Sequence, residues 1–332
     1  MGRDVLPTTA PLPSRWVDAC LQEPRLQRLL PFYYLVSRAE PGDLSDGQRQ
    51  ELEQHYRRSL RTDMLQHLEL QRVVTAFADQ SLPILPLKGS LLGLRLYGEL
   101  GRPSADIDLL AKDGDIPRSA DLLLSLGYTA HEDVGRYDIL FHRGEAPNAH
   151  FIELHRSLGY LSRSAAGFPA HVWEGARFDR VGDLRCWQMD PADELIYLCV
   201  NLVKHRFAGP FLALDVHLAL QRWAPEIDWR SLLETVRRFR LEHQVSAALF
   251  CAHHWFGTEA PSELKALRLP LWKKGWLKGV EWTSGFERAV RLLRPPAHLH
   301  LLFHLLLLAE TTKDRTGYLR DGLDVVRRRW RR

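Results

Sequence analysis

The sequence is poor in cysteine and methionine, with four and three residues in a chain of 332. The cysteines stand far apart, at positions 20, 186, 199 and 251, and no Cys-x-x-Cys pair occurs. This spacing argues against a cysteine zinc site and against a disulfide framework. Cys199 and Cys251 lie in apolar segments with helical periodicity, so we expect both to be small core residues.

A hydrophobic run long enough to cross a membrane is also missing. The most apolar stretch, residues 299–309, is interrupted by His300 and His304. It is shorter than the roughly 20 residues that a membrane-spanning helix needs. No charged and then apolar signal segment opens the sequence. We therefore expect a protein without a transmembrane segment, located in the reducing cytoplasm.

Complete zinc motifs are absent among the histidines as well. His253 and His254 are adjacent, so on a helix they point about 100° apart. His300 and His304 have the i, i+4 spacing of a zinc-binding pair, but no glutamate stands at the metalloprotease position and no third ligand is evident. We expect these histidines to be satisfied core residues.

Neither sign of charge dominates the chain. Lysine and arginine number 45 and aspartate and glutamate 41, which gives a net charge of +4. Binding along a nucleic-acid backbone usually needs a clearly basic surface, so long nucleic acid is the least favoured partner. The basic residues within 325–332 are interpreted as a solvated helix end, with contact to anionic lipid or RNA as the alternative.

The most informative segment covers residues 85–110, LPLKGSLLGLRLYGELGRPSADIDLL. A short apolar run ends in Lys-Gly-Ser, a helical segment follows, and Asp-Ile-Asp then lies inside a second apolar run. Side chains two positions apart on a strand point to the same face, so Asp106 and Asp108 are expected to project together. Adjacent carboxylates repel each other, and a divalent cation between them removes the repulsion.

Each part of this segment has an ordinary explanation when taken alone. Asp-x-Asp is most often a strand end or a turn, and Lys-Gly-Ser is usually a turn with serine as the helix N-cap. The order of the parts is more specific: a strand, a Gly-Ser turn able to hold phosphate, a helix, and a strand with two acids. This order favours a metal and phosphate site.

A third acid follows in Phe-Ile-Glu-Leu-His at residues 151–155, which alternates like a strand. Glu153 and His155 would share one face. Two aspartates on one strand and an acid on a neighbouring strand are what two-metal phosphoryl chemistry needs. The alternatives are a surface acid at Glu153, and either an outer hydrogen-bond partner or a phosphate contact at His155.

These motifs resemble those of the nucleotidyltransferase superfamily, whose core is similar to that of DNA polymerase beta. Within it, the chain most resembles the bacterial family of uncharacterised nucleotidyltransferases, over roughly residues 80–220. The matching positions are Leu87-Lys88-Gly89, Leu96-Tyr97, Arg102, Ala105 to Leu110, Ile152 to His155, Pro191 to Leu195, Lys204-His205 and Asp215.

The resemblance implies roles for individual residues. Gly89 and Ser90 would hold the β- and γ-phosphates of a nucleoside triphosphate. Asp106 and Asp108 would bind two Mg²⁺ ions, with Mn²⁺ as the alternative metal. Glu153 would bind the metal nearer the acceptor and help to activate the acceptor's hydroxyl group.

Four basic residues are further candidates for holding the nucleotide. Lys88 could meet a phosphate as a point charge, or could be a solvated strand end. Arg102 could bind the triphosphate bidentately, or pair with the aspartates when metal is absent. Lys204 and His205 end a helix and could line a cleft opposite the acids, although basic residues also favour helix C-termini through the macrodipole.

The expected fold class is α+β, a small mixed β-sheet flanked by helical regions. We assign residues 1–78 to an N-terminal helical region, 79–187 to the nucleotidyltransferase core and 188–332 to a C-terminal helical domain. The last two expected strands would complete the sheet. The expected strands are 84–87, 107–111, 137–142, 149–155, 178–181 and 184–187, and the main expected helices are 44–77, 90–98, 116–126 and one starting at 191.

The resemblance and the motifs together predict Mg²⁺-dependent transfer of a nucleoside monophosphate from ATP or another NTP, with release of pyrophosphate. The acceptor would be a hydroxyl or phosphate of a small molecule, sugar, peptide or protein. Two alternatives are a non-catalytic nucleotide- or partner-binding module and a metal-dependent transferase that uses a sugar-nucleotide donor.

Overall fold

The computed structural model describes residues 8, 13–40, 42–131, 138–145, 149–158, 165–205, 207 and 210–282. The expectations for residues 299–309, His300, His304 and the basic segment 325–332 lie outside these residues. The described residues fall into two compact units. Residues 8–158 and 169–190 form the sheet unit, and residues 165–168 and 191–282 form the helical unit. The domain boundaries expected from the sequence stay a prediction.

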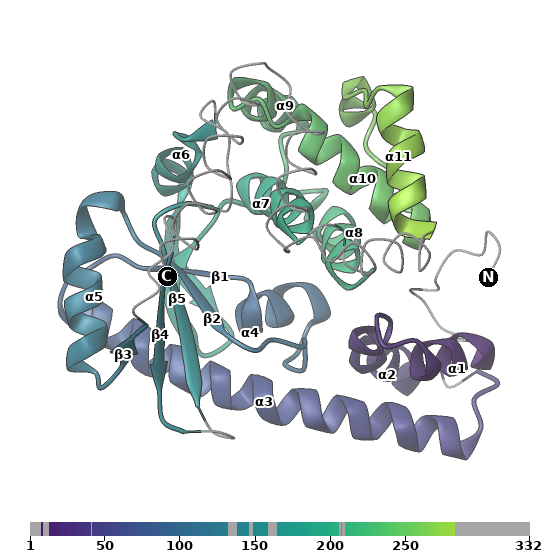
Figure 1. The fold of residues 1–332 in the computed structure, drawn as a ribbon, viewed down its shortest axis with the longest axis horizontal. Helices are drawn as coiled ribbons and strands as arrows, with labels where there is room; N and C mark the ends of the chain where they lie inside the picture. The colour runs from purple at the N-terminus through teal and green to yellow at the C-terminus, as the bar shows by residue number, and fades with distance from the viewer. Residues whose placement is uncertain are drawn as a thin grey trace, which may run out of the picture. The chain divides into compact units, whose positions relative to one another are not determined.

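A five-stranded mixed sheet forms the centre of the sheet unit, in the order β1-β2-β5-β4-β3 (Figure 1). β2 and β5 are parallel, and the other neighbouring strands are antiparallel. Helices together with a small mixed sheet confirm the expected α+β class. The strands are β1 (Leu85–Leu87), β2 (Ile107–Leu110), β3 (Thr129–Ala130), β4 (Asp138–Arg143) and β5 (His150–His155).

Alternation along β2 and β5 decides which face of the sheet is apolar. Ile107, Leu109, Ile152 and Leu154 are buried and belong to one hydrophobic cluster. Helix α3 (Asp46–Asp79) contributes its C-terminal half to this cluster, and helix α5 (Ile116–Ser125) contributes its apolar side. The residues between these apolar positions project to the opposite face, which carries the acids.

The helices of the sheet unit begin and end at recognisable signals. α3 starts at a capping box in which Ser45 and Gln48 satisfy each other's backbone N–H groups. α5 is followed by Gly127, whose φ of 84° suits glycine at a helix C-terminus. The expected helices at 44–77 and 116–126 are therefore confirmed. Two shorter helices precede them, α1 (Ser14–Gln22) and α2 (Leu30–Ala39).

Part of the sequence expectation was wrong. The strands β6 (Arg177–Val181) and β7 (Leu184–Gln188) pair with each other in a separate two-stranded sheet instead of completing the main one. Strand β1 has only three residues, and its central Pro86 has no N–H to donate, so β1 is a poor template for a further strand. The expected helix 90–98 is a short helix α4 (Gly89–Leu92) followed by a π-helical segment η2 (Gly93–Tyr97).

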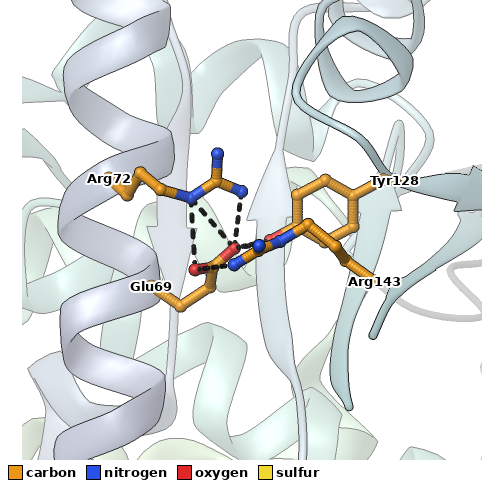
Figure 2. A network of polar contacts seen from close by, with 4 residues as sticks. All are labelled: Glu69, Arg72, Tyr128 and Arg143. Atoms are coloured by element: carbon orange, nitrogen blue, oxygen red, sulfur yellow. Dashed lines mark hydrogen bonds and ion pairs between the residues drawn. The ribbon is translucent and has the colours of Figure 1, made fainter. Parts of the chain in front are cut away.

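An ionic network fastens α3 to the far edge of the sheet (Figure 2). The carboxylate of Glu69 accepts hydrogen bonds from Arg72, at 2.7 Å, and from Arg143 on β4, at 2.6 Å. The hydroxyl of Tyr128, between α5 and β3, donates to the same carboxylate. Burial raises the pKa of Glu69, but these hydrogen bonds outweigh it and bring the pKa to about 2.

The helical unit consists of helices with apolar faces packed on one another. α7 begins at Pro191 as expected, and α7, α8 and α10 pack together. Cys199 and Cys251 are buried within it, as expected for core residues. In the part of the chain that the structure describes, no helix is both long and apolar enough to span a bilayer. The helices are α7 (Pro191–Lys204), α8 (Phe211–Trp223), α9 (Trp229–Arg238), α10 (Glu242–Phe256) and α11 (Leu271–Trp282), and the sheet unit adds α6 (Phe168–Gly175), most of which belongs to it.

Candidate active site

The parallel pairing of β2 and β5 places Asp108 directly beside Glu153. Directly paired residues project to the same face of a sheet, so the two carboxylates share the face opposite the hydrophobic cluster. His155 lies two residues further along β5 and therefore joins them. The sequence predicted Glu153 on a strand next to the aspartate strand, and the strand register confirms that arrangement.

Asp108 is only 3% exposed, and both of its carboxylate oxygens have partners. Its Oδ2 lies 3.0 Å from Lys88 Nζ, and its Oδ1 lies 2.9 Å from His155 Nε2. Burial alone would raise the pKa of Asp108, but Lys88 and His155 together hold it well below its usual value. Asp108 is therefore a carboxylate, and one of its oxygens is already bonded to a lysine.

Three side chains of this face could hold a metal ion together. Ligand atoms of Asp108, Glu153 and His155 all lie within 4.8 Å of one another, and within the described ranges this is the single group with that property. His155 Nε2 is 3.3 Å from Glu153 Oε2. His155 is buried, whereas the side chain of Glu153 is 30% exposed. Glu153 is thus the ligand open to another molecule.

β2 begins at Ile107, as in the expected strand 107–111, so Asp106 precedes the strand that carries Asp108. Asp106 is not part of the three-residue group, but the charges of that group are close enough to change its pKa. Burial raises the pKa of Asp106, and the neighbouring carboxylates of Asp108 and Glu153 raise it further. Asp106, Asp108 and Glu153 are thus close enough to affect one another's charge, and such a group of carboxylates suits a divalent ion.

The Lys-Gly-Ser turn joins β1 to α4 next to these acids. Lys88 and Gly89 both have positive φ, 51° and 58°. A positive φ is strained for lysine, and such strain often accompanies function. Ser90 is buried, and its hydroxyl lies 3.2 Å from His67 Nδ1 on α3. His67 Nε2 in turn lies 2.9 Å from Asp183 in the β6–β7 turn.

Arg102 occupies the loop between η2 and β2 and is only 4% exposed. Asp63 of α3 holds this loop, because its Oδ2 accepts a hydrogen bond from Gly101 N at 2.7 Å. Burial raises the pKa of Asp63, and the positive charge of Arg102 lowers it. Arg102 is thus a buried cation beside Asp63 as well as a neighbour of the acidic strand in sequence.

Lys204 and His205 lie in the last turn of α7 and directly after it, in the helical unit. The two residues belong to a different unit from the acids, and their contribution to the site stays a prediction. The same holds for Asp215, which is buried in α8.

Sequence reasoning missed Asp138 and His67, which contact predicted site residues, and Asp183, which contacts His67. Asp138 stands opposite His155 in the β4–β5 register, and its Oδ2 lies 3.9 Å from His155 Nδ1. This position could have been found by counting residues back from the hairpin turn. His67 and Asp183 carried no local signal, because His67 meets Ser90, and Asp183 meets His67, only through tertiary packing.

Comparisons with known proteins give one family match. A sequence model of the family described as "Uncharacterised nucleotidyltransferase" matches residues 15–257. A search of curated proteins finds no match.

Two solved structures of ANT(2″)-Ia are similar to parts of the chain. One is a crystal structure in complex with adenylyl-2″-tobramycin, at 12% identity over 53% of this chain and 97% of that chain, with a TM-score of 0.35. The other is a solution structure of this antibiotic-resistance factor, at 15% identity over 58% of this chain and 98% of that chain, with a TM-score of 0.38.

Proposed function

Because the chain belongs to the family of uncharacterised nucleotidyltransferases, we propose that it transfers a nucleoside monophosphate from an NTP to an acceptor hydroxyl or phosphate. Pyrophosphate is the leaving group. The observation that carries this proposal is the direct pairing of Asp108 with Glu153 on parallel strands, next to the Lys-Gly-Ser turn. Acids at this spacing beside a phosphate-binding turn are what metal-assisted nucleotidyl transfer requires.

The donor set fits divalent cations. Asp106, Asp108 and Glu153 offer carboxylate oxygens, the ligands that Mg²⁺ prefers. The pKa of Asp106, raised by burial and by the neighbouring carboxylates, supports this fit, because a bound cation would stabilise its ionised form. When bound, the metal ions neutralise charge on the phosphates and lower the pKa of the attacking oxygen.

The residues of the turn would bind and orient the triphosphate. Lys88 Nζ now contacts Asp108 at 3.0 Å and supplies a positive charge at the point where phosphates would approach. Gly89 has no side chain, so its backbone N–H is accessible to a phosphate oxygen. Ser90 adds a hydroxyl, and Arg102 adds a second cation on the loop that leads to the acids.

Glu153 would act on the acceptor. Its side chain is 30% exposed, more than those of Asp108 and His155, so an acceptor hydroxyl can reach its carboxylate. Glu153 would take the proton from that hydroxyl as it attacks the α-phosphate. His155 Nε2 lies 3.3 Å from Glu153 Oε2 and can stabilise the change in charge that this proton transfer causes. Lys204 and His205 are proposed to contact the base or the triphosphate.

The proposed partners are therefore an NTP and a non-nucleic-acid acceptor. A reducing cytoplasm is the proposed location, supported by four free, buried cysteines.

A product assay with isotopically labelled ATP tests the reaction type. Purified protein is incubated with Mg²⁺, a small-molecule metabolite extract as acceptor mixture, and ATP labelled at either the α- or the γ-phosphate. Nucleotidyl transfer moves the α label to a product and leaves the γ label in pyrophosphate. Transfer of the γ label with formation of ADP would contradict the proposal and indicate a kinase.

A further inference from the structure

His155 stands between the two carboxylates in a position suited to a metal ligand. Its Nε2 lies 2.9 Å from Asp108 Oδ1 and 3.3 Å from Glu153 Oε2. Two ligands bound at right angles to an ion, each at about 2.1 Å, are about 3 Å apart. The three atoms thus have the mutual spacing of neighbouring ligands on one ion, without rearrangement of the strands.

Asp138 provides the outer contact that a metal-bound histidine usually has. It pairs with His155 across the β4–β5 register, and its Oδ2 lies 3.9 Å from His155 Nδ1. A small side-chain rotation would allow Nδ1–H to donate to this carboxylate. Metal-bound histidines commonly donate their second ring N–H to a carboxylate, which fixes the tautomer and leaves the other nitrogen's lone pair for the metal.

Lys88 does not compete for the same oxygen. It contacts Oδ2 of Asp108, whereas His155 faces Oδ1. Asp108 can therefore keep its bond to Lys88 while Oδ1 binds an ion. A neutral imidazole and two carboxylates give a ligand charge of −2, which matches a divalent cation.

We propose that His155 Nε2 is a direct metal ligand together with Asp108 and Glu153, oriented by Asp138, and that this site prefers Mn²⁺ to Mg²⁺. Mg²⁺ favours oxygen ligands, whereas imidazole suits transition metals, so one nitrogen ligand shifts the preference toward Mn²⁺. The inference rests on the proposed function, because it concerns the metal that nucleotidyl transfer would use. It departs from the sequence expectation, in which His155 was either an outer hydrogen-bond partner or a phosphate contact.

The test is metal binding by the full-length protein without nucleotide. Mn²⁺ affinity is measured by electron paramagnetic resonance and Mg²⁺ affinity by calorimetry. We expect Mn²⁺ to bind at least about tenfold more tightly than Mg²⁺, with spin-echo modulation from a bound imidazole nitrogen. His155→Asn should abolish the nitrogen signal and the preference. Asp138→Asn should weaken Mn²⁺ binding by about 10- to 100-fold.

His142→Asn is the matched control, because His142 is a β4 histidine outside the three-residue group. It should leave Mn²⁺ binding unchanged. If His155→Asn fails to fold, the partly exposed Asp138 still provides the test through Asp138→Asn.

The proposal is overturned if the folded wild type does not bind Mn²⁺, if bound Mn²⁺ shows no nitrogen coupling, or if Asp138→Asn binds Mn²⁺ like wild type. None of these results decides whether nucleotidyl transfer occurs, because the product assay with Mg²⁺ answers that separately.

Discussion

At the scale of single residues, the two aspartates of the Asp-Ile-Asp segment differ in a way that the sequence does not reveal. Spacing alone predicted that both point to one face. Asp108 is on β2 and bonded to Lys88 and His155, whereas Asp106 lies before the strand. Strand alternation is a local property and could be read from the sequence. The partners of each carboxylate depend on tertiary packing, so they could not.

This difference predicts that substitutions of Asp106 and Asp108 change the stability of the fold in opposite directions. The pKa of Asp108 is lowered by its contacts with Lys88 and His155, so at neutral pH its ionised form stabilises the fold. Asp108→Asn should lower the free energy of unfolding by about 3 kcal/mol, because it removes the buried charge that faces Lys88 at 3.0 Å. The pKa of Asp106 is raised by burial and by neighbouring acids, so its ionised form destabilises the fold. Asp106→Asn should therefore raise the melting temperature.

Thermal unfolding at pH 7 with a chelator present measures both effects without metal. Equal destabilisation by the two substitutions would show that the charges on this face are not distributed as described. Both variants should nevertheless lose metal-dependent activity, because each removes a carboxylate from the proposed site.

At the scale of elements, the fold was easier to predict than its connections. Strands 107–111 and 149–155 were recognised from alternation, and helix 44–77 from the period of its apolar residues. The separate hairpin of β6 and β7 was missed because pairing between strands is not a local property. The role of α3 in holding both Ser90 and the sheet edge was also unpredictable, since it depends on contacts far apart in sequence.

The network around Glu69 predicts a pH dependence of unfolding. The folded pKa, about 2, lies below the unfolded value of about 4.3, so the stabilisation is fully present above that value. It should be lost as the pH falls toward 2. Between pH 4.5 and 2, Glu69→Gln should therefore lose less stability than wild type, measured by urea unfolding at each pH.

Glu53→Gln is the control for this prediction. Glu53 lies on the same helix and pairs with Arg57 at 2.6 Å, but both side chains are exposed, so the pair contributes little. Its pH profile should match wild type. A Glu69→Gln profile that also matches wild type would show that the network does not depend on the ionised carboxylate.

The contact between His67 and Ser90 predicts a coupling between α3 and the Lys-Gly-Ser turn. A double-mutant cycle with His67→Ala and Ser90→Ala should give an interaction energy of about 1 kcal/mol in the free energy of unfolding. Gln71→Ala is the control. Gln71 lies on α3 like His67, and its side chain contacts Asp183 at 3.3 Å. Its effect should add to that of Ser90→Ala. If the effects of His67→Ala and Ser90→Ala on the free energy of unfolding simply add, the two side chains do not interact as described.

At the scale of the whole molecule, the family and the location of the acids were predictable, and the acceptor was not. Motifs within residues 85–155 identify the family that the match over residues 15–257 confirms. The described residues of the two units interleave in the sequence, because residues 165–168 belong with 191–282. No local sequence pattern indicates this arrangement.

The central claim is that this chain binds a nucleotide through metal ions held by its acidic face. Calorimetric titration of the four NTPs, with and without Mg²⁺ or Mn²⁺, tests it most directly. The variant is Asp108→Asn, and the control is Asp113→Asn, an exposed acid outside the site. The account predicts metal-dependent binding to wild type and control that Asp108→Asn loses. Binding that needs no metal, or that survives Asp108→Asn in a folded protein, would contradict it.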